Sequence, residues 1–288
     1  MRDEGEVLTL ILDYARRDEN VRAVVMNGSR LNPNAKKDPF QDYDIVYLVR
    51  DVAPLRRNPA LVRHFGDILI LQTPEEMIDP PPENDGTYGY LMQFIDGVRI
   101  DLTIAPLEQC PEYVADSLSR VLLDKDQLIP ALQPPSDRGY LPGRPTARRF
   151  EDCCNEFWWL NPYVAKGLWR DELTYAKEIF EGPLRHEFMN MLTWYFGLRT
   201  DFQVSPGKAG KYLRQGLDPA LWAQVEETYP DARTDHIWDA LLLMGDLFRR
   251  LAGDVAQAFG FVYPDADDRN VTAFIRRIRQ LPADATTI

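Results

Sequence analysis

A segment rich in proline and glycine divides the chain into two parts whose sequence patterns differ. It runs from Pro130 to Pro145, reads PALQPPSDRGYLPGRP and lacks hydrophobic periodicity, as is typical of a linker. Short apolar runs suited to β-strands occur before it, and helical spacing dominates after it. We therefore expect two domains, at residues 1–135 and 146–288.

The first part has the pattern of a mixed β-sheet flanked by helices. An amphipathic helix is expected at the N-terminus, and apolar runs typical of strands follow at VRAVVMNG, DYDIVYLV and DILILQTP. In residues 88–105, YGYLMQFIDGVRIDLTIA, two apolar stretches flank Asp96-Gly97. Asp-Gly is a preferred pair for a two-residue turn, so this region is predicted to be a β-hairpin.

The second part predicts an all-helical domain, because the apolar residues recur at helical spacing and several segments end at glycine or proline. The chain as a whole is therefore predicted to be α+β, with its sheet confined to the N-terminal domain. The expected helices cover residues 149–160, 163–181, 184–198, 218–228, 234–259 and 268–281.

The charge balance limits the partners of the protein. The formal net charge is −12, which argues against a nucleic-acid or anionic-membrane surface and favours the approach of a cationic small molecule. A purely solubilising role for this charge is the simpler alternative. The N-terminus does not resemble a signal peptide, no apolar run is long enough for a membrane span, and the three cysteines lack zinc-site spacing. We expect a reduced, cytoplasmic monomer.

Two aspartates lie at the start of a strand-like run, shortly after a glycine–serine turn. Residues two apart on a strand project to the same side, so Asp42 and Asp44 should point together about 7 Å apart. Like charges at this spacing need a compensating cation, and Mg²⁺ prefers oxygen ligands. Gly28 and Ser29 follow an apolar strand and could bind phosphate oxygens close to the backbone.

A third acid lies within an alternating strand. In VRIDLTIA, Arg99, Asp101 and Thr103 share one face and the apolar residues share the other. Asp101 is therefore either a solvated residue of the exposed face or a third member of the carboxylate site.

The order of these features resembles the DNA polymerase β-like nucleotidyltransferase superfamily, which carries Gly-Ser, a spacer, Asp-x-Asp and a later carboxylate on a neighbouring strand. The spacer here runs from Arg30 to Gln41. The segments MNGSR.NPN..KD.FQDYDIVY, YLMQF.DG.RIDLT and EFWW..PYVAKGLWRDEL.YAK are similar to the aminoglycoside 6-adenylyltransferases, which modify streptomycin. This resemblance covers most of the chain.

The resemblance implies transfer of AMP from ATP to a hydroxyl of streptomycin, at the 6-position of the streptidine ring. The reaction releases pyrophosphate and confers antibiotic resistance. On this interpretation Asp42 and Asp44 hold Mg²⁺, which is expected as two ions. Asp101 either completes the second metal site or acts as the base for the acceptor hydroxyl.

The resemblance also assigns residues to the nucleotide. Gly28 and Ser29 would hold the outgoing pyrophosphate, and Arg30 would assist them. Lys166, in the tryptophan-rich block, and Lys208, in the turn SPGKAGKYL, are further candidates for phosphate contact. For Lys208 a solvated helix start is an equally good interpretation.

The helical domain would supply the acceptor site. Streptomycin carries two guanidinium groups, so its site should offer carboxylates and flat aromatic faces. The segment NEFWWLNPYVAKGLWRDELTYAK supplies both, and Trp169 and Glu172 would share one face of a helix. Each tryptophan is individually more typical of a core, and exposed acids are usually solvated. The predicted acceptor residues are Glu156, Trp159, Trp169, Asp171 and Glu172.

Other functions fit the pattern less well. An enzyme of the same fold could act on another aminoglycoside, a lincosamide or a protein side chain. A degenerate, regulatory nucleotidyltransferase would be expected to have lost at least one site residue, and none is missing here. A glycosyltransferase with a metal-binding Asp-x-Asp would need a larger sheet, and no Gly-x-Gly-x-x-Gly motif is present. The three scattered histidines disfavour a zinc enzyme or a histidine-based hydrolase.

Overall fold

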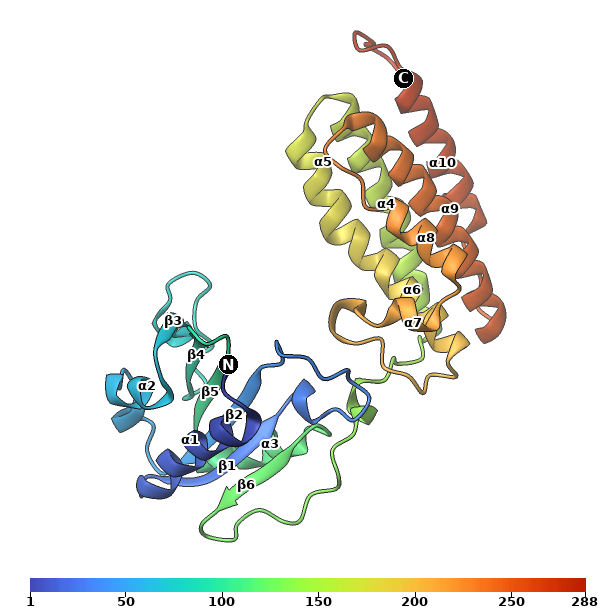
Figure 1. Ribbon diagram of the computed structural model, residues 1–288. Coiled ribbons are helices and arrows are strands. Elements are labelled where there is room, and N and C mark those ends of the chain that lie inside the picture. The colour runs from blue at the N-terminus through green and yellow to red at the C-terminus, as the bar shows by residue number, and fades with distance from the viewer. The chain divides into compact units, whose positions relative to one another are not determined.

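The computed structural model describes residues 1–288, which form two compact units, Met1–Gly139 and Tyr140–Ile288. The division falls inside the proline- and glycine-rich segment. The first unit contains every strand, and the second contains only helices and turns, as the element labels in Figure 1 show. The chain thus combines a mixed sheet with helices, as the sequence predicts.

Six strands form the sheet of the first unit, in the order β3-β4-β5-β2-β1-β6. The central pair, β2 and β5, is parallel, and the other neighbours are antiparallel. The strands are β1 (Val21–Asn27), β2 (Tyr43–Val49), β3 (Ile68–Gln72), β4 (Tyr88–Phe94), β5 (Arg99–Pro106) and β6 (Arg120–Asp124). The strand β6 was not expected from the sequence, because it is short and pairs only with β1 at the sheet edge.

Helices cover both faces of this sheet. Alternate residues of β1 divide between the two faces, as the pleat of a strand requires: Val24 packs with α1 (Glu4–Arg17) and α2 (Pro59–Phe65), and Val25 packs on the side of α3 (Cys110–Ala115). The inward stripe of α1, Val7, Ile11 and Ala15, is fully buried. The first core is therefore built from apolar residues that alternate in strands and recur at helical spacing in helices.

The hairpin between β4 and β5 is present, but its turn differs from the prediction. The Gly97 amide donates to the Phe94 carbonyl, and the Phe94 amide donates to the Val98 carbonyl. Three residues, 95–97, therefore make the connection, with Gly97 at φ +88°. Asp-Gly serves here in a three-residue loop whose last residue is left-handed, a geometry that glycine favours.

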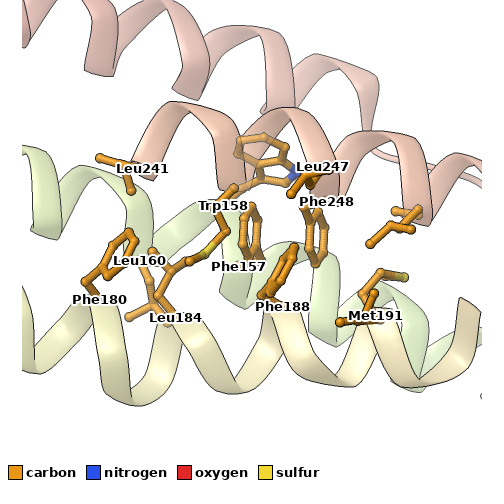
Figure 2. Packing of buried hydrophobic residues seen from close by; sticks show 14 of the residues in the cluster. Phe157, Trp158, Leu160, Phe180, Leu184, Phe188, Met191, Leu241, Leu247 and Phe248 are labelled. Carbon is orange, nitrogen blue, oxygen red and sulfur yellow. The ribbon is translucent and has the colours of Figure 1, made fainter. Parts of the chain in front are cut away.

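The second unit is a helical bundle around one apolar core. Its helices are α4 (Ala147–Trp169), α5 (Leu173–Ile179), α6 (Arg185–Arg199), α7 (Leu213–Gly216), α8 (Pro219–Glu227), α9 (Thr234–Phe259) and α10 (Asp265–Gln280). The rings of Phe157 in α4 and Phe248 in α9 stack with centroids 3.7 Å apart, and Trp158 meets both edge-on (Figure 2). The edge-on pairs that Trp158 makes add to the stabilisation from burial alone.

Two helix boundaries predicted from proline were wrong. The helix α4 continues through Pro162, where the buried Asn161 side chain donates to the Phe157 carbonyl. It ends instead at Arg170, and Asp171 has a left-handed φ of +59°. Near Pro183 the chain stays helical through a π-helical turn, Phe180–Leu184, that joins α5 to α6. The π-helical turn accommodates Pro183 by a local change of hydrogen bonding, whereas at Pro162 the helix continues without the amide that would bond to the Trp158 carbonyl.

No helix is both long and apolar enough to cross a membrane.

Candidate active site

The glycine–serine turn follows β1 directly and lies against the Asp44 carboxylate. Gly28 has φ +83°, and a Cβ built on it would lie only 1.9 Å from Asp44 Oδ2. Its amide donates to the Leu118 carbonyl at 3.1 Å. Gly28 therefore contributes space for the carboxylate, whereas its amide is already used within the fold. Ser29 begins the short 3-10 helix Ser29–Leu31.

The parallel pairing of β2 with β5 brings the predicted carboxylates together. Asp44 and Asp101 are register partners on these neighbouring strands, whose spacing is about 4.8 Å. Both lie on the same sheet face as Val46 and Ala105, which pack on the side of α3. Asp42 lies two residues before Asp44 and is within 3.7 Å of Arg99, which also contacts Asp101.

Arg99 is a site residue that the sequence reasoning did not assign. Its Nε and Nη2 donate to the two oxygens of Asp101 at 2.9 and 2.8 Å. The acids Asp101, Asp42 and Asp44 all help to raise the pKa of the guanidinium, which stays charged. The alternation of Arg99, Asp101 and Thr103 on one strand face was the feature that could have identified it.

The carboxylates experience one another electrostatically. Burial raises the pKa of Asp42, the Asp101 charge adds to this effect, and Arg99 and Arg30 oppose it. A raised pKa in a carboxyl means that its charged form is destabilised where it lies. The site therefore holds more negative charge than Arg99 alone neutralises.

The donor set fits a hard divalent cation, although the side chains are not arranged around one. Carboxylate oxygens are the ligands that Mg²⁺ prefers, and Gly28 lets the Asp44 carboxylate lie against the turn. No three acidic, histidine or cysteine side chains are grouped to hold a metal ion. Arg99 instead supplies the positive charge beside Asp42 and Asp101.

The predicted nucleotide-binding residues lie in both units. Gly28, Ser29 and Arg30 belong to the first unit, where the Arg30 guanidinium donates to backbone carbonyls at the start of β2. Lys166 lies on α4, with its ammonium 4.9 Å from the centre of the Tyr163 ring. Lys208 is exposed in the short 3-10 turn Lys208–Gly210. The phosphate contacts of all five remain predictions.

Comparison with known proteins assigns the family. The family described as streptomycin adenylyltransferase matches residues 1–278. An aminoglycoside 6-adenylyltransferase of Bacillus subtilis is 38% identical over 270 residues, 93% of this chain and 95% of that protein. One from Campylobacter jejuni is 38% identical over 278 residues, 96% of each chain.

The chain belongs to the streptomycin adenylyltransferase family. Its members are nucleotidyltransferase enzymes, and the resemblance inferred from the sequence is confirmed. Among solved structures, an aminoglycoside 6-adenyltransferase from Bacillus subtilis is 33% identical, with 98% of this chain and 100% of that chain covered and a TM-score of 0.48.

The acceptor residues predicted for this family member do not form one site. Glu156 and Trp159 lie within α4, and Trp159 is 62% exposed. Trp169, Asp171 and Glu172 lie at the end of α4 and beyond it. At 1.5 Å per residue, Glu156 and Trp169 are about 20 Å apart along the helix axis. One small acceptor cannot contact both groups directly.

Within the second group, Trp169 makes structural contacts. It packs against the core, and its Nε1 donates to the Leu281 carbonyl at 3.3 Å. Glu172 precedes α5 without a capping hydrogen bond from its side chain, which lies 3.8 Å from Arg170. The expectation that Trp169 and Glu172 share one helical face was wrong, because the helix breaks between them at Asp171.

A cavity of about 710 Å³ opens beside the first turns of α4. Three acids line it, Glu151, Asp152 and Asp267, against a single cation, Arg148, and Phe261 supplies an aromatic wall. Its volume is within the range of small-molecule sites. These acids were missed because their segments read as ordinary solvated helix starts.

Proposed function

We propose that the protein transfers AMP from ATP to a hydroxyl of streptomycin, at the 6-position of the streptidine ring, and so confers resistance. The observation that carries the proposal is the position of Asp44, which lies against the Gly28 turn and beside its register partner Asp101, with Asp42 two residues before it. Family membership favours an aminoglycoside as the acceptor. Another aminoglycoside, a lincosamide or a protein side chain is the alternative acceptor on the same fold.

The carboxylates would act as one unit toward the nucleotide. Asp42 and Asp44 would hold Mg²⁺ with the ATP phosphates, and Asp101 would join them from β5. The bound ions would withdraw charge from the α-phosphate and orient the attacking and leaving oxygens. Gly28 leaves room for the Asp44 carboxylate in this arrangement, and Ser29, the next residue, would contact the outgoing pyrophosphate.

Arg99 balances the carboxylates of the protein itself. It lies within hydrogen-bond distance of Asp101 and within ion-pair distance of Asp42. A fixed cation at this point lowers the repulsion among the three acids and keeps Asp101 in one orientation. Arg99 would thus hold the site in order before the nucleotide and its ions arrive.

The helical unit would receive the acceptor. Streptomycin is a dication, and a site for it needs acids and flat apolar faces. Glu156 and the exposed Trp159 on α4 remain candidates. The cavity lined by Glu151, Asp152 and Asp267 offers the same chemistry.

The experiment incubates the protein with ATP, Mg²⁺ and a panel of aminoglycosides, a lincosamide and a lysate protein fraction. Mass spectrometry then detects the addition of AMP to each compound. We expect AMP on streptomycin and pyrophosphate in equal amount. Addition only to a different compound would replace streptomycin as acceptor, and no addition to any acceptor would reject the proposed activity.

A further inference from the structure

Arg30 is almost enclosed by the elements that form the carboxylate site. Its side chain is 12% exposed. Nη2 donates to the Gln41 carbonyl at 2.6 Å, and Nε donates to the Asp42 carbonyl at 3.3 Å. One guanidinium therefore ties the residue after the Gly28-Ser29 turn to the residues that lead into β2.

The remaining surfaces of the guanidinium are also in contact. Its carbon lies 3.8 Å from the centre of the Tyr43 ring, and Tyr43 is 4% exposed. Nη1 lies 3.4 Å from Glu4 Oε2 in α1. All three nitrogens and one face of Arg30 are thus engaged by the protein. A guanidinium held in this way has little left with which to bind a phosphate.

A second contact closes the same loop. The Gln41 side-chain amide donates to the Ser29 carbonyl at 3.4 Å. Within residues 30–41, the end of the short 3-10 helix Ser29–Leu31 is the only regular secondary structure. The β1–β2 ladder ends at the Asn27–Asp44 pair, so beyond it the approach of Ser29 to Gln41 and Asp42 is held by the Arg30 and Gln41 contacts.

We propose that Arg30 is a positioning residue that fixes the distance between the Gly28-Ser29 turn and Asp42, which lies just before β2. This inference rests on the proposed function, because that distance must match a triphosphate and its metal ions. A planar guanidinium can donate to two carbonyls in one plane and stack on a ring at the same time, and a lysine ammonium cannot. The role therefore requires the guanidinium of arginine, and a positive charge alone is not sufficient.

The test compares Arg30→Lys and Arg30→Met with the wild-type protein. Displacement of reacting groups by about 1 Å can cost about 100-fold in rate. We expect kcat to fall about 100-fold in both variants, while KM for ATP and the Kd for ATP in the absence of acceptor stay unchanged. Hydrogen exchange should accelerate in residues 30–42 and stay unchanged in β4 and β5.

Two further variants test the stacking contact. Tyr43→Phe keeps the ring and should keep kcat, whereas Tyr43→Leu removes it and should lower kcat in the same way as Arg30→Lys. The double variant Arg30→Lys with Tyr43→Leu should lose less than the product of the two single losses, because the two side chains act through one contact.

Arg185 provides a matched control in the helical unit. Its guanidinium carbon lies 3.8 Å from the Tyr229 ring centre, its Nη1 donates to Thr228 and its Nη2 lies 3.3 Å from Glu181. Arg185→Lys therefore removes the same kinds of contact elsewhere. It should lower the thermal unfolding midpoint and leave kcat per folded molecule unchanged.

Three results would overturn the proposal. Wild-type activity in Arg30→Lys, together with a Kd for ATP raised about tenfold or more in Arg30→Met, would identify Arg30 as a phosphate contact. A loss of activity in proportion to the loss of folded protein, as expected for Arg185→Lys, would identify a purely structural role for Arg30. Unchanged exchange in residues 30–42 would show that Arg30 does not fix the loop. That measurement needs no turnover, so it separates this proposal from a wild-type protein that transfers no AMP.

Discussion

At the residue scale, Gly28 is required by the space that it leaves. A methyl group at this position would overlap the Asp44 carboxylate, and the left-handed φ of +83° would strain any other residue. Two independent features therefore demand glycine. One is the close approach of the Asp44 side chain, and the other is the backbone conformation. The sequence shows the glycine but not the carboxylate that fills the space beside it.

Gly28→Ala is expected to abolish most turnover and to lower the free energy of unfolding by about 1 to 3 kcal/mol. Gly86→Ala is the matched control, because Gly86 has φ +89° but nothing lies within 4 Å of its added Cβ. Denaturant unfolding and steady-state kinetics on both variants separate the two effects. Normal turnover in Gly28→Ala would show that the Asp44 carboxylate does not need its present position.

Asp42→Asn should separate function from stability. The pKa of Asp42 is raised chiefly by burial, so its charged form is disfavoured in the fold at neutral pH. We expect kcat to fall at least about 100-fold, while the thermal midpoint stays equal to that of the wild type or rises. Asp38→Asn, in the same loop, should change neither quantity. Unfolding of Asp42→Asn would mean that the carboxylate is structural.

At the scale of elements, an ion pair links the start of α1 to the β4–β5 turn. The backbone amide and Nε of Arg2 both donate to Asp96 Oδ2, at 3.1 and 2.8 Å. The Arg2 side chain lowers the pKa of Asp96 to about 2. The folded pKa is therefore below the unfolded value of about 3.9, so ionised Asp96 stabilises the fold above pH 4.

This stabilisation should disappear as the pH falls from about 4 to about 2. We expect Asp96→Asn to lower the free energy of unfolding at pH 7 by about 1 to 2 kcal/mol, after allowance for solvent screening of the partly exposed pair. The measurement is denaturant unfolding of both proteins between pH 7 and pH 2. A difference that persists unchanged at pH 2 would contradict the ion-pair explanation.

The sequence predicted those elements whose patterns are local. The strands β1, β2, β4 and β5 carry continuous or alternating apolar residues, and α9 covers the same residues as its prediction, 234–259. Proline misled at Pro162 and Pro183, because α4 continues through the first and a π-helical turn accommodates the second. The strand β6 depends on pairing with β1, which no local pattern shows.

The candidate site was likewise predictable only where its residues lie in local sequence patterns. Asp44 and Asp101 are acids within apolar strands, and the register of β2 and β5 makes them neighbours, with Asp42 just before β2. Arg30 contacts residues distant in the sequence, and Arg99 contacts Asp101 on its own strand face. Sequence spacing alone does not reveal which partner each arginine takes. Trp169 was assigned by composition, and the structure shows it partly buried against the helical core.

At the scale of the whole molecule, the two compact units each have their own core and their own share of the chemistry. The carboxylates and the Gly28 turn lie in Met1–Gly139, and the acid-lined cavity lies in Tyr140–Ile288. Transfer between two substrates requires both to be held. We therefore propose that the first unit holds the metal ions and most of the triphosphate, and that the second holds the acceptor.

Neutralising the cavity should affect the acceptor alone. We expect the double variant Glu151→Gln with Asp267→Asn to raise KM for streptomycin about tenfold or more, because charge-assisted hydrogen bonds contribute about 1.5 to 3 kcal/mol each. KM for ATP should not change. Glu172→Gln, at the far end of α4, is the control and should leave both constants unaltered. A raised KM for streptomycin in Glu172→Gln, with no change in the double variant, would place the acceptor site at the end of α4.

The central claim is that the α-phosphate of ATP, with its adenosine, moves to streptomycin. The most direct measurement incubates the wild-type protein with Mg²⁺, streptomycin and ATP labelled at either the α- or the γ-phosphate, and follows each label. The account predicts α-label on streptomycin and γ-label in pyrophosphate. γ-label on streptomycin, or α-label that never leaves the nucleotide pool, would contradict it.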